Sequence, residues 1–284
     1  MAAVEARTGV DSGGRATGES PRLDLARSPL RFLLPLAVVA AVILSWDLVV
    51  RLNNLPPYIL PGPGLVLETL VKDRVVLFGS LLVTLRITLL ALLAAVVGGV
   101  GLAILFASAR IIELSLFPLA VILQVTPVVA IAPLMLIYLD PGTAVLVCAF
   151  IVAFFPILAN TTLGLNSVDP NLRDLFVLSG AGRWQTLRYL RLPAALPYFL
   201  GGLRIGGGLA LIGAIVAEIA AGSAGQGSGL AFRIVESGYR LNIPRMFAAL
   251  ALISLTGIVI YLVLTLISWL ALRRWHESAL GAGN

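Results

Sequence analysis

Long apolar stretches alternate with short polar ones along most of this chain. After a polar first segment, apolar residues dominate 30–50 and then roughly 80–108, 114–139, 142–166, 198–222 and 246–272. A helix of about 20 apolar residues crosses the ~30 Å hydrocarbon core of a bilayer with every backbone group hydrogen-bonded internally. The pattern therefore predicts an all-α, polytopic membrane protein with six transmembrane helices. Prolines at 118, 127, 133 and 156 fall inside these runs and predict kinks or breaks.

Composition strengthens this reading, because 59% of the residues are hydrophobic and only 12% are charged. Soluble domains are about 45–50% apolar and about 25% charged. A single cysteine, Cys148, excludes a disulfide within the chain, and a single histidine, His276, excludes any site that needs two imidazoles. In a membrane protein the net charge of +6 indicates orientation and contact with anionic lipid rather than with nucleic acid.

The polar and apolar segments divide the chain into three parts. Residues 1–28 are rich in Gly, Ser and Arg and predict a disordered N-terminal tail, and residues 276–284 form a short C-terminal tail. The membrane domain between them covers 29–275. Its first apolar run favours a membrane helix over a signal peptide, because it is long enough to span and no small-residue cleavage site precedes "RLNNLPPY".

The distribution of basic residues predicts the orientation. Six spans place both termini on one side of the membrane. That side carries Arg7, Arg15, Arg22, Arg27, Arg31, Arg110, Arg173, Arg183, Arg188, Arg191, Arg273 and Arg274, and the other side carries Arg51, Lys72, Arg74, Arg233, Arg240 and Arg245. This two-to-one bias predicts that both termini are cytoplasmic. The outer segments 51–79 and 223–245 either contact an external partner or are solvated loops.

One basic segment, "SGAGRWQTLRYLRLPAALP" from residue 179, interrupts the apolar pattern on the predicted cytoplasmic side. Asp169 and Pro170 predict a helix start, and Gly180 suits the left-handed residue that ends a helix. A second short helix over 182–190, ended by Pro193, completes a helix–turn–helix elbow over about 169–193. Its predicted apolar face consists of Trp184, Leu187 and Leu190. The residues leave two readings open: a basic loop on anionic headgroups, or a docking element for a cytoplasmic protein.

The spacing within this elbow resembles the cytoplasmic signature of binding-protein-dependent ABC transporter permeases. That signature reads Glu-Ala-Ala, three residues, Gly, nine residues, then Ile-x-Leu-Pro. When "DLFVLSGAGRWQTLRYLRLP" is aligned on Gly180, Leu190 takes the Ile position, Leu192 and Pro193 match, and Asp174 stands where the family has Glu. The flanking "LPAALP", "GGLRI", "IVAEIAAG", "SLLVTLRI", "TPVVAIAPLMLIYL" and "FFPILANTTLGLNSVD" extend the resemblance to nitrate, taurine and alkanesulfonate permeases over roughly 55–272.

The resemblance implies a permease subunit of an importer in the bacterial cytoplasmic membrane. Two permease subunits, here a homodimer, form the pathway, and an extracytoplasmic solute-binding protein delivers the cargo. Two copies of a cytoplasmic ABC ATPase bind ATP and Mg²⁺ and grip the coupling element. The residues implied in that contact are Asp174, Gly180, Arg183, Trp184, Leu187, Arg188, Leu192 and Pro193. The chain itself has no Gly-x-x-x-x-Gly-Lys-[Ser/Thr] motif, so we expect no ATP site, cofactor, metal or enzymatic activity in it.

Polar residues inside the predicted spans are candidates for lining the translocation path. They are Glu218, Arg86, Gln124, Thr126 and Asn160. Each also has a structural reading: Glu218 pairs with Arg86 or another basic group, Arg86 snorkels to the interface, and the other three form interhelical hydrogen bonds.

The resemblance leaves the cargo open between a sulfonate-, nitrate- or taurine-like anion and a thiamine-precursor- or riboflavin-like organic molecule. A second class of function is an ion-driven secondary transporter or channel, which also needs spans, broken helices and buried polar groups. The elbow separates the two classes, because an ion-driven carrier has no use for an ATPase docking element.

Overall fold

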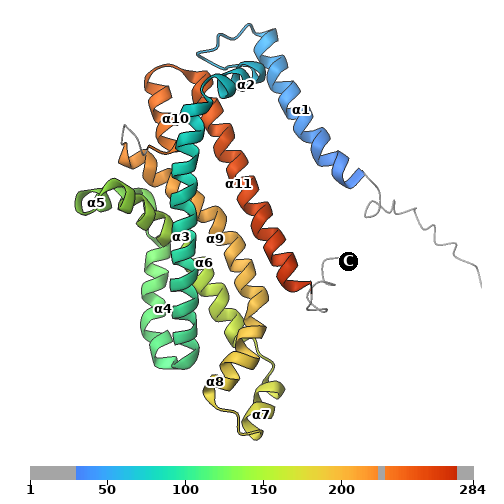
Figure 1. Cartoon of the computed structure of the whole chain (residues 1–284), viewed down its shortest axis with the longest axis vertical. Coiled ribbons are helices and arrows are strands. Elements are labelled where there is room, and N and C mark those ends of the chain that lie inside the picture. Colours follow the sequence, from blue (N-terminus) through green and yellow to red (C-terminus); the bar gives the residue numbers. More distant parts are fainter. Residues whose placement is uncertain (1–29, 223–227, 274–284) are drawn as a thin grey trace, which may run out of the picture. The chain divides into compact units, whose positions relative to one another are not determined.

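The computed structural model describes residues 30–222 and 228–273, and these residues are helical apart from their short connections (Figure 1). The predicted tails 1–28 and 276–284 lie outside the described residues. In chain order the elements are α1 (Leu30–Leu52), α2 (Pro63–Lys72), α3 (Arg74–Ser108), α4 (Arg110–Val125), α5 (Val128–Tyr138), α6 (Pro141–Asn166), α7 (Pro170–Leu178), α8 (Arg183–Thr186), a π-helical turn η1 (Leu187–Arg191), α9 (Leu192–Ala221), α10 (Leu230–Tyr239) and α11 (Ile243–Leu272).

The all-helical prediction is confirmed, and within the described ranges five helices are long and apolar enough to cross a membrane. A sixth candidate span consists of α4 and α5, which meet at an angle of 98°. The break that the prolines in the run 114–139 predict is therefore found at Pro127. The break falls at Thr126 and Pro127 because Pro127 has no N–H to donate and holds Thr126 in an extended conformation (φ −73°, ψ 122°).

Among the described residues, 30–49 belong to a unit separate from the residues that follow, so α1 is considered by itself. It is an apolar helix whose leucine and valine side chains are exposed on all of its faces. A helix that is hydrophobic all round is typical of a membrane span, where lipid covers every face.

Within residues 50–284, α6 and α9 pack most extensively on each other, and α3 packs on α6. Small residues allow the close approach of α6 and α9, because a Cβ atom at Gly202 would lie 2.8 Å from the carbonyl oxygen of Pro156. At Gly213 a Cβ atom would lie 2.9 Å from Cα of Ala149. Such small-residue contacts are characteristic of helix association in membranes, where packing rather than water exclusion drives assembly.

Two groups of short helices lie at opposite ends of this bundle (Figure 1). Helices α2 and α10 lie at one end, where Arg245 of α11 donates from Nε to Oδ2 of Asp73, between α2 and α3, at 2.6 Å. Helices α7 and α8 lie at the other end, and α9 runs between the two groups. Helix α9 is therefore a continuous link between the two ends of the bundle.

Candidate functional site

The first arm of the elbow is α7, and local hydrogen bonds define both of its ends. Asp169 caps the start by accepting a hydrogen bond from the backbone N–H of Asn171 at 2.8 Å. At the other end Gly180 has φ +71°, its N–H donates to the carbonyl of Val177, and the N–H of Ala181 donates to that of Phe176. This pair of bonds is a Schellman motif, which requires a residue in the left-handed conformation, and glycine adopts that conformation without strain.

The second arm is not the separate short helix that the sequence predicts. It begins with Gly182, whose N–H donates to Oε1 of Gln185, and runs through α8 and η1 directly into α9. Pro193 does not end it, because the N–H of Leu192 reaches back five residues to the carbonyl of Leu187. The wider π turn removes the clash that a proline ring makes with the carbonyl four residues earlier in an α-helix. The arm is therefore an extension of the longest candidate span, Arg183–Ala221.

The π turn also changes which side chains of the elbow are accessible. Trp184 is 67% exposed, whereas Leu187 is only 8% exposed and packs in a core cluster with Phe106 and Leu165. The prediction of a shared apolar face with Leu190 is wrong, because the i→i+5 hydrogen bonding of the π turn widens the helix and disrupts the i, i+3 spacing on which that face depends. Of the two predicted anchors only Trp184 offers its side chain to a partner.

The remaining residues predicted for the elbow divide into two groups by burial. Asp174, Gly180, Arg183 and Arg188 are exposed, and Leu192 and Pro193 are half-buried where the arm enters α9. The exposed guanidinium of Arg188 lies over the ring of Tyr189, 5.7 Å from its centroid. The elbow thus presents one large aromatic side chain with charged side chains beside it.

Glu218 lies at the other end of α9, 5% exposed, and caps the start of α10. Its Oε1 accepts a hydrogen bond from the Thr84 hydroxyl at 2.8 Å and its Oε2 accepts one from the N–H of Ala231 at 3.1 Å. The Thr84 oxygen in turn accepts the N–H of Leu230 at 2.9 Å. A Cβ atom at residue 229 would fall on the Glu218 carboxylate, so only glycine fits there.

This arrangement corrects the expected partner of Glu218 and adds a residue that the sequence analysis missed. Glu218 bonds to Thr84 and the α10 backbone rather than to Arg86, which is exposed on α3. A signal for Thr84 exists in the sequence, since Ser80, Thr84 and Thr88 recur every four residues in a strongly apolar helix. All three are buried, as a polar stripe facing other helices should be.

The other candidates for the path lie on different elements. Gln124 is exposed near the end of α4, and Thr126 lies at the break before α5 and donates to the carbonyl of Ile122 at 2.7 Å. Asn160 is half-buried in α6 and donates from Nδ2 to the carbonyl of Pro156 at 2.8 Å. In the described part of the chain no hydrogen bond or ion pair joins any two of the five candidates. Nor does any group of three His, Cys, Asp or Glu side chains gather there to hold a metal ion.

Comparison with known proteins gives consistent matches. The family described as the binding-protein-dependent transport system inner membrane component matches residues 95–275. The riboflavin transport system permease protein RibX of Chloroflexus aurantiacus is 34% identical over 92% of this chain and 97% of its own. The formylaminopyrimidine transport permease protein ThiX of Halalkalibacterium halodurans is 32% identical over 82% of this chain and 90% of its own.

The fold also has a counterpart among solved structures. A crystal structure described as an amino acid ABC transporter with histidines aligns with a TM-score of 0.59, covering 71% of this chain and 96% of that chain. At 21% sequence identity this likeness concerns the arrangement of the helices alone.

Proposed function

Since this chain belongs to the family of binding-protein-dependent ABC transporter permeases, we propose that it forms the pathway through which an importer carries a small solute into the cell. Members of this family are multi-pass transport subunits without an ATPase domain, so the chain is not an enzyme, carries no cofactor and relies on a partner ATPase to handle ATP. A binding protein is its second partner. The proposal further specifies uptake as the direction of transport, the elbow as the docking site, and two copies each of the permease and the ATPase.

The elbow, α7 to η1, docks on the ATPase in the cytoplasm. Its continuity with α9 supports this role, because a helix without a break carries a push along its axis into the membrane. Trp184 supplies the anchor, since a large exposed aromatic side chain beside charges is a typical hot spot. Asp174, Arg183 and Arg188 form the surrounding charged rim, which contributes less to affinity. Leu187, Leu192 and Pro193 hold the arm against the bundle.

Cytoplasmic placement of the elbow follows from the two-to-one excess of basic residues on its side of the membrane. With the elbow inside, α2 and α10 at the opposite end of the bundle face the exterior (Figure 1). They lie where the solute-binding protein arrives. Both chain termini are then cytoplasmic, in the bacterial cytoplasmic membrane.

Two copies of this chain form the pathway as a homodimer, with one ATPase per permease. The broken span supports a path beside α4 and α5, because interrupted helices at membrane depth are tolerated where they line a water-filled cavity. Gln124 and Thr126 lie at that break, and among the described residues Gln124 is exposed and Thr126 half-buried. Arg86, exposed on α3, and Asn160 are further candidates, whereas Glu218 acts as a buried cap.

The cargo we propose is a small, uncharged organic solute with several hydrogen-bonding groups. The relatives named for riboflavin and formylaminopyrimidine transport, at 34% and 32% identity, support this class over small anions. So do the side chains at the break, since Gln124 and Thr126 are neutral hydrogen-bonding groups rather than cations.

The test of the docking role is a glycine substitution that alters only the backbone of the elbow. Gly180→Val introduces a β-branched residue at φ +71°, where nothing lies within 4 Å of the new Cβ atom, so strain in the turn is the only change. Gly182→Val is the matched control, because Gly182 has φ −67° and ψ 162°, which valine adopts freely. We expect both variants to insert into the membrane, and only Gly180→Val to lose co-purification with the ATPase and ATP-dependent uptake. Full coupling in Gly180→Val would contradict the proposal.

A further inference from the structure

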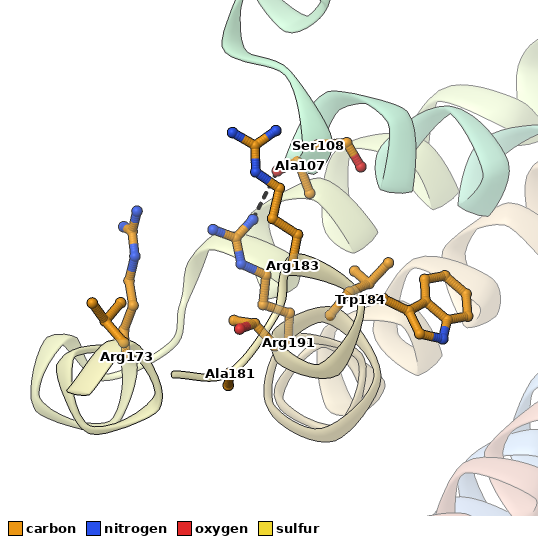
Figure 2. A pocket seen from close by; sticks show the side chains of 10 residues that line it. Ala107, Ser108, Arg173, Ala181, Arg183, Trp184 and Arg191 are labelled. Atoms are coloured by element: carbon orange, nitrogen blue, oxygen red, sulfur yellow. Dashed lines mark hydrogen bonds between the residues drawn. The ribbon is translucent and has the colours of Figure 1, made fainter. Parts of the chain in front are cut away.

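A pocket of about 590 Å³ lies between the elbow and the end of α3. Its wall is formed on one side by Ala107 and Ser108, the last residues of α3, and on the other side by residues of α7, α8 and η1. Three arginines line it, namely Arg173 from α7, Arg183 from α8 and Arg191 from η1. Figure 2 shows the Arg183 and Arg191 side chains reaching toward the end of α3, while the Trp184 ring points away from them.

The pocket concentrates positive charge without a carboxylate to balance it. No Asp or Glu lines it. Arg191 donates from Nη1 to the carbonyl of Ala107 at 2.8 Å, and this bond fixes one guanidinium against the end of α3. In the part of the chain that the structure describes, Arg173 and Arg183 form no ion pair. By contrast, Arg233 and Arg245 at the other end of the bundle each bond to a carboxylate.

Arginines arranged in this way suit a particular class of ligand. A guanidinium is planar and presents its donors as a fork that matches the oxygens of a phosphate in pairs. Three forks around one cavity exceed what a single carboxylate can accept, whereas a phosphate monoester presents three terminal oxygens and a charge of about −1.5 to −2. The volume also leaves room for the atoms attached to a phosphate ester.

The location narrows the source of that phosphate. Ser108 ends a 35-residue helix that, at a rise of about 1.5 Å per residue, is longer than the ~30 Å hydrocarbon core, so the pocket lies beyond the core on its headgroup side. Basic pockets between transmembrane helices on the cytoplasmic side bind the headgroups of anionic lipids. We propose that this pocket binds a phosphate group, supplied by an anionic phospholipid headgroup or by free phosphate. The lipid source rests on the cytoplasmic orientation in the proposed function.

A bound phosphate would accept hydrogen bonds from arginines on three elements at once, namely α7, α8 and η1. It would neutralise the mutual repulsion of the arginines on α7, α8 and η1 and hold both arms of the elbow to the end of α3. The proposed occupant therefore stiffens the elbow that the ATPase contacts; Trp184 also lines the pocket, but its ring points away from the arginines (Figure 2).

The experiment measures lipid binding by the purified full-length chain without any ATPase. Delipidated protein in detergent is titrated with phosphatidic acid, whose headgroup is a phosphate monoester, and, separately, with zwitterionic phosphatidylcholine, and bound lipid is counted by native mass spectrometry. The variants are Arg173→Gln, Arg173→Lys and, as a control of equal charge change, Arg188→Gln, since Arg188 is on the same elbow and does not line the pocket. Inorganic phosphate is added as a competitor in a parallel series.

We expect Arg173→Gln to weaken phosphatidic acid binding about fivefold, the loss that corresponds to about 1 kcal/mol for one basic residue near the headgroups. Arg173→Lys should lose less, and Arg188→Gln should bind like the unsubstituted chain. Displacement by millimolar inorganic phosphate identifies free phosphate as a ligand, and resistance to it identifies the lipid. Equal losses in Arg173→Gln and Arg188→Gln, or equal binding of both lipids, would overturn the proposal.

Co-purification of the ATPase with the same variants tests the docking role separately. If phosphatidic acid and phosphatidylcholine bind equally well to the unsubstituted chain while the ATPase still co-purifies with it, the phosphate site is ruled out and the docking role stands. Absence of ATPase binding to the unsubstituted chain would remove the docking role and leave the lipid result standing.

Discussion

The hydroxyl of Thr84 on α3 donates a 2.8 Å hydrogen bond to the carboxylate of Glu218 on α9 and, at 2.9 Å, accepts the backbone N–H of Leu230 at the start of α10. The second carboxylate oxygen of Glu218 accepts the N–H of Ala231 at 3.1 Å. Three helices are joined at one buried point, and the carboxylate lies where the dipole of α10 favours negative charge. This cap ties α10 to the end of α9 that is opposite the elbow.

Removing the Thr84 hydroxyl should destabilise the protein. Thr84→Val leaves a buried carboxylate oxygen and a buried backbone N–H without a partner, and each such group costs about 1–3 kcal/mol. The control is Thr88→Val, one turn along the same helix, whose hydroxyl is buried without a hydrogen-bond partner. Thermal unfolding of the purified protein in detergent should show a lower melting temperature for Thr84→Val and an unchanged or higher one for Thr88→Val. Equal effects of the two substitutions would argue against the cap.

A methyl group at residue 229 should disrupt the same junction from the other side. Gly229 has φ −77°, which any residue adopts, so Gly229→Ala adds no backbone strain and acts only through the contact of its Cβ with the Glu218 carboxylate. We expect loss of stability and of ATP-dependent uptake. Gly201→Ala on α9 serves for comparison, because no atom lies within 4 Å of its Cβ position and alanine favours a helix. Wild-type stability in Gly229→Ala would show that α10 does not rest on Glu218 as described.

The charged cluster on α10 predicts a pH dependence of stability. A hydrogen bond from Arg233 lowers the pKa of Glu236, and partial burial opposes this shift while the charges of Arg233, Arg240 and Arg245 add to it. Because the folded pKa lies below the unfolded one, the stabilisation is fully present above the unfolded pKa. It is lost as the pH falls through the folded pKa.

The Glu236→Gln variant should therefore show a shallower loss of melting temperature on acidification than the unsubstituted chain. Glu68→Gln is the control, since Glu68 is an exposed carboxylate on α2. It should retain the original slope. Parallel slopes for all three proteins would mean that the Glu236 cluster contributes nothing to stability.

Much of the fold could be predicted from the sequence because lipid imposes a simple rule. Every backbone group in the hydrocarbon core must be bonded internally, so apolar runs of about 20 residues become helices wherever they occur. The turn at Gly180 was also predictable, because capping by Asp169 and a left-handed glycine are local events. Periodicity and local motifs thus predict the apolar spans and the first arm of the elbow, but not the short helices α2 and α10.

The second arm of the elbow and the Glu218 cap were not predictable, and the physical reason is the same for both. A proline usually ends a helix, but around Pro193 a π turn absorbs the misfit and the helix continues, which depends on the packing of Leu187 among residues of α3 and α6. Likewise, the sequence suggests Arg86 as an electrostatic partner of Glu218, whereas in the fold the N-terminus of α10 lies against the Glu218 carboxylate. Both outcomes depend on contacts between distant segments that sequence patterns do not encode.

The most direct test of the central claim, that an ATPase grips the elbow from the cytoplasm, is site-specific labelling. Cys148 is the only cysteine, so Leu178→Cys and Tyr239→Cys are each made with Cys148→Ala and exposed to a membrane-impermeant maleimide in inside-out and right-side-out vesicles. Both positions are exposed, Leu178 on α7 and Tyr239 on α10 at the other end of the bundle, and neither substitution removes the Trp184 anchor. The account predicts labelling at 178 only in inside-out vesicles with protection by the bound ATPase, and labelling at 239 only in right-side-out vesicles without protection. Labelling at 178 from the outside, or equal labelling with and without the ATPase, would contradict it.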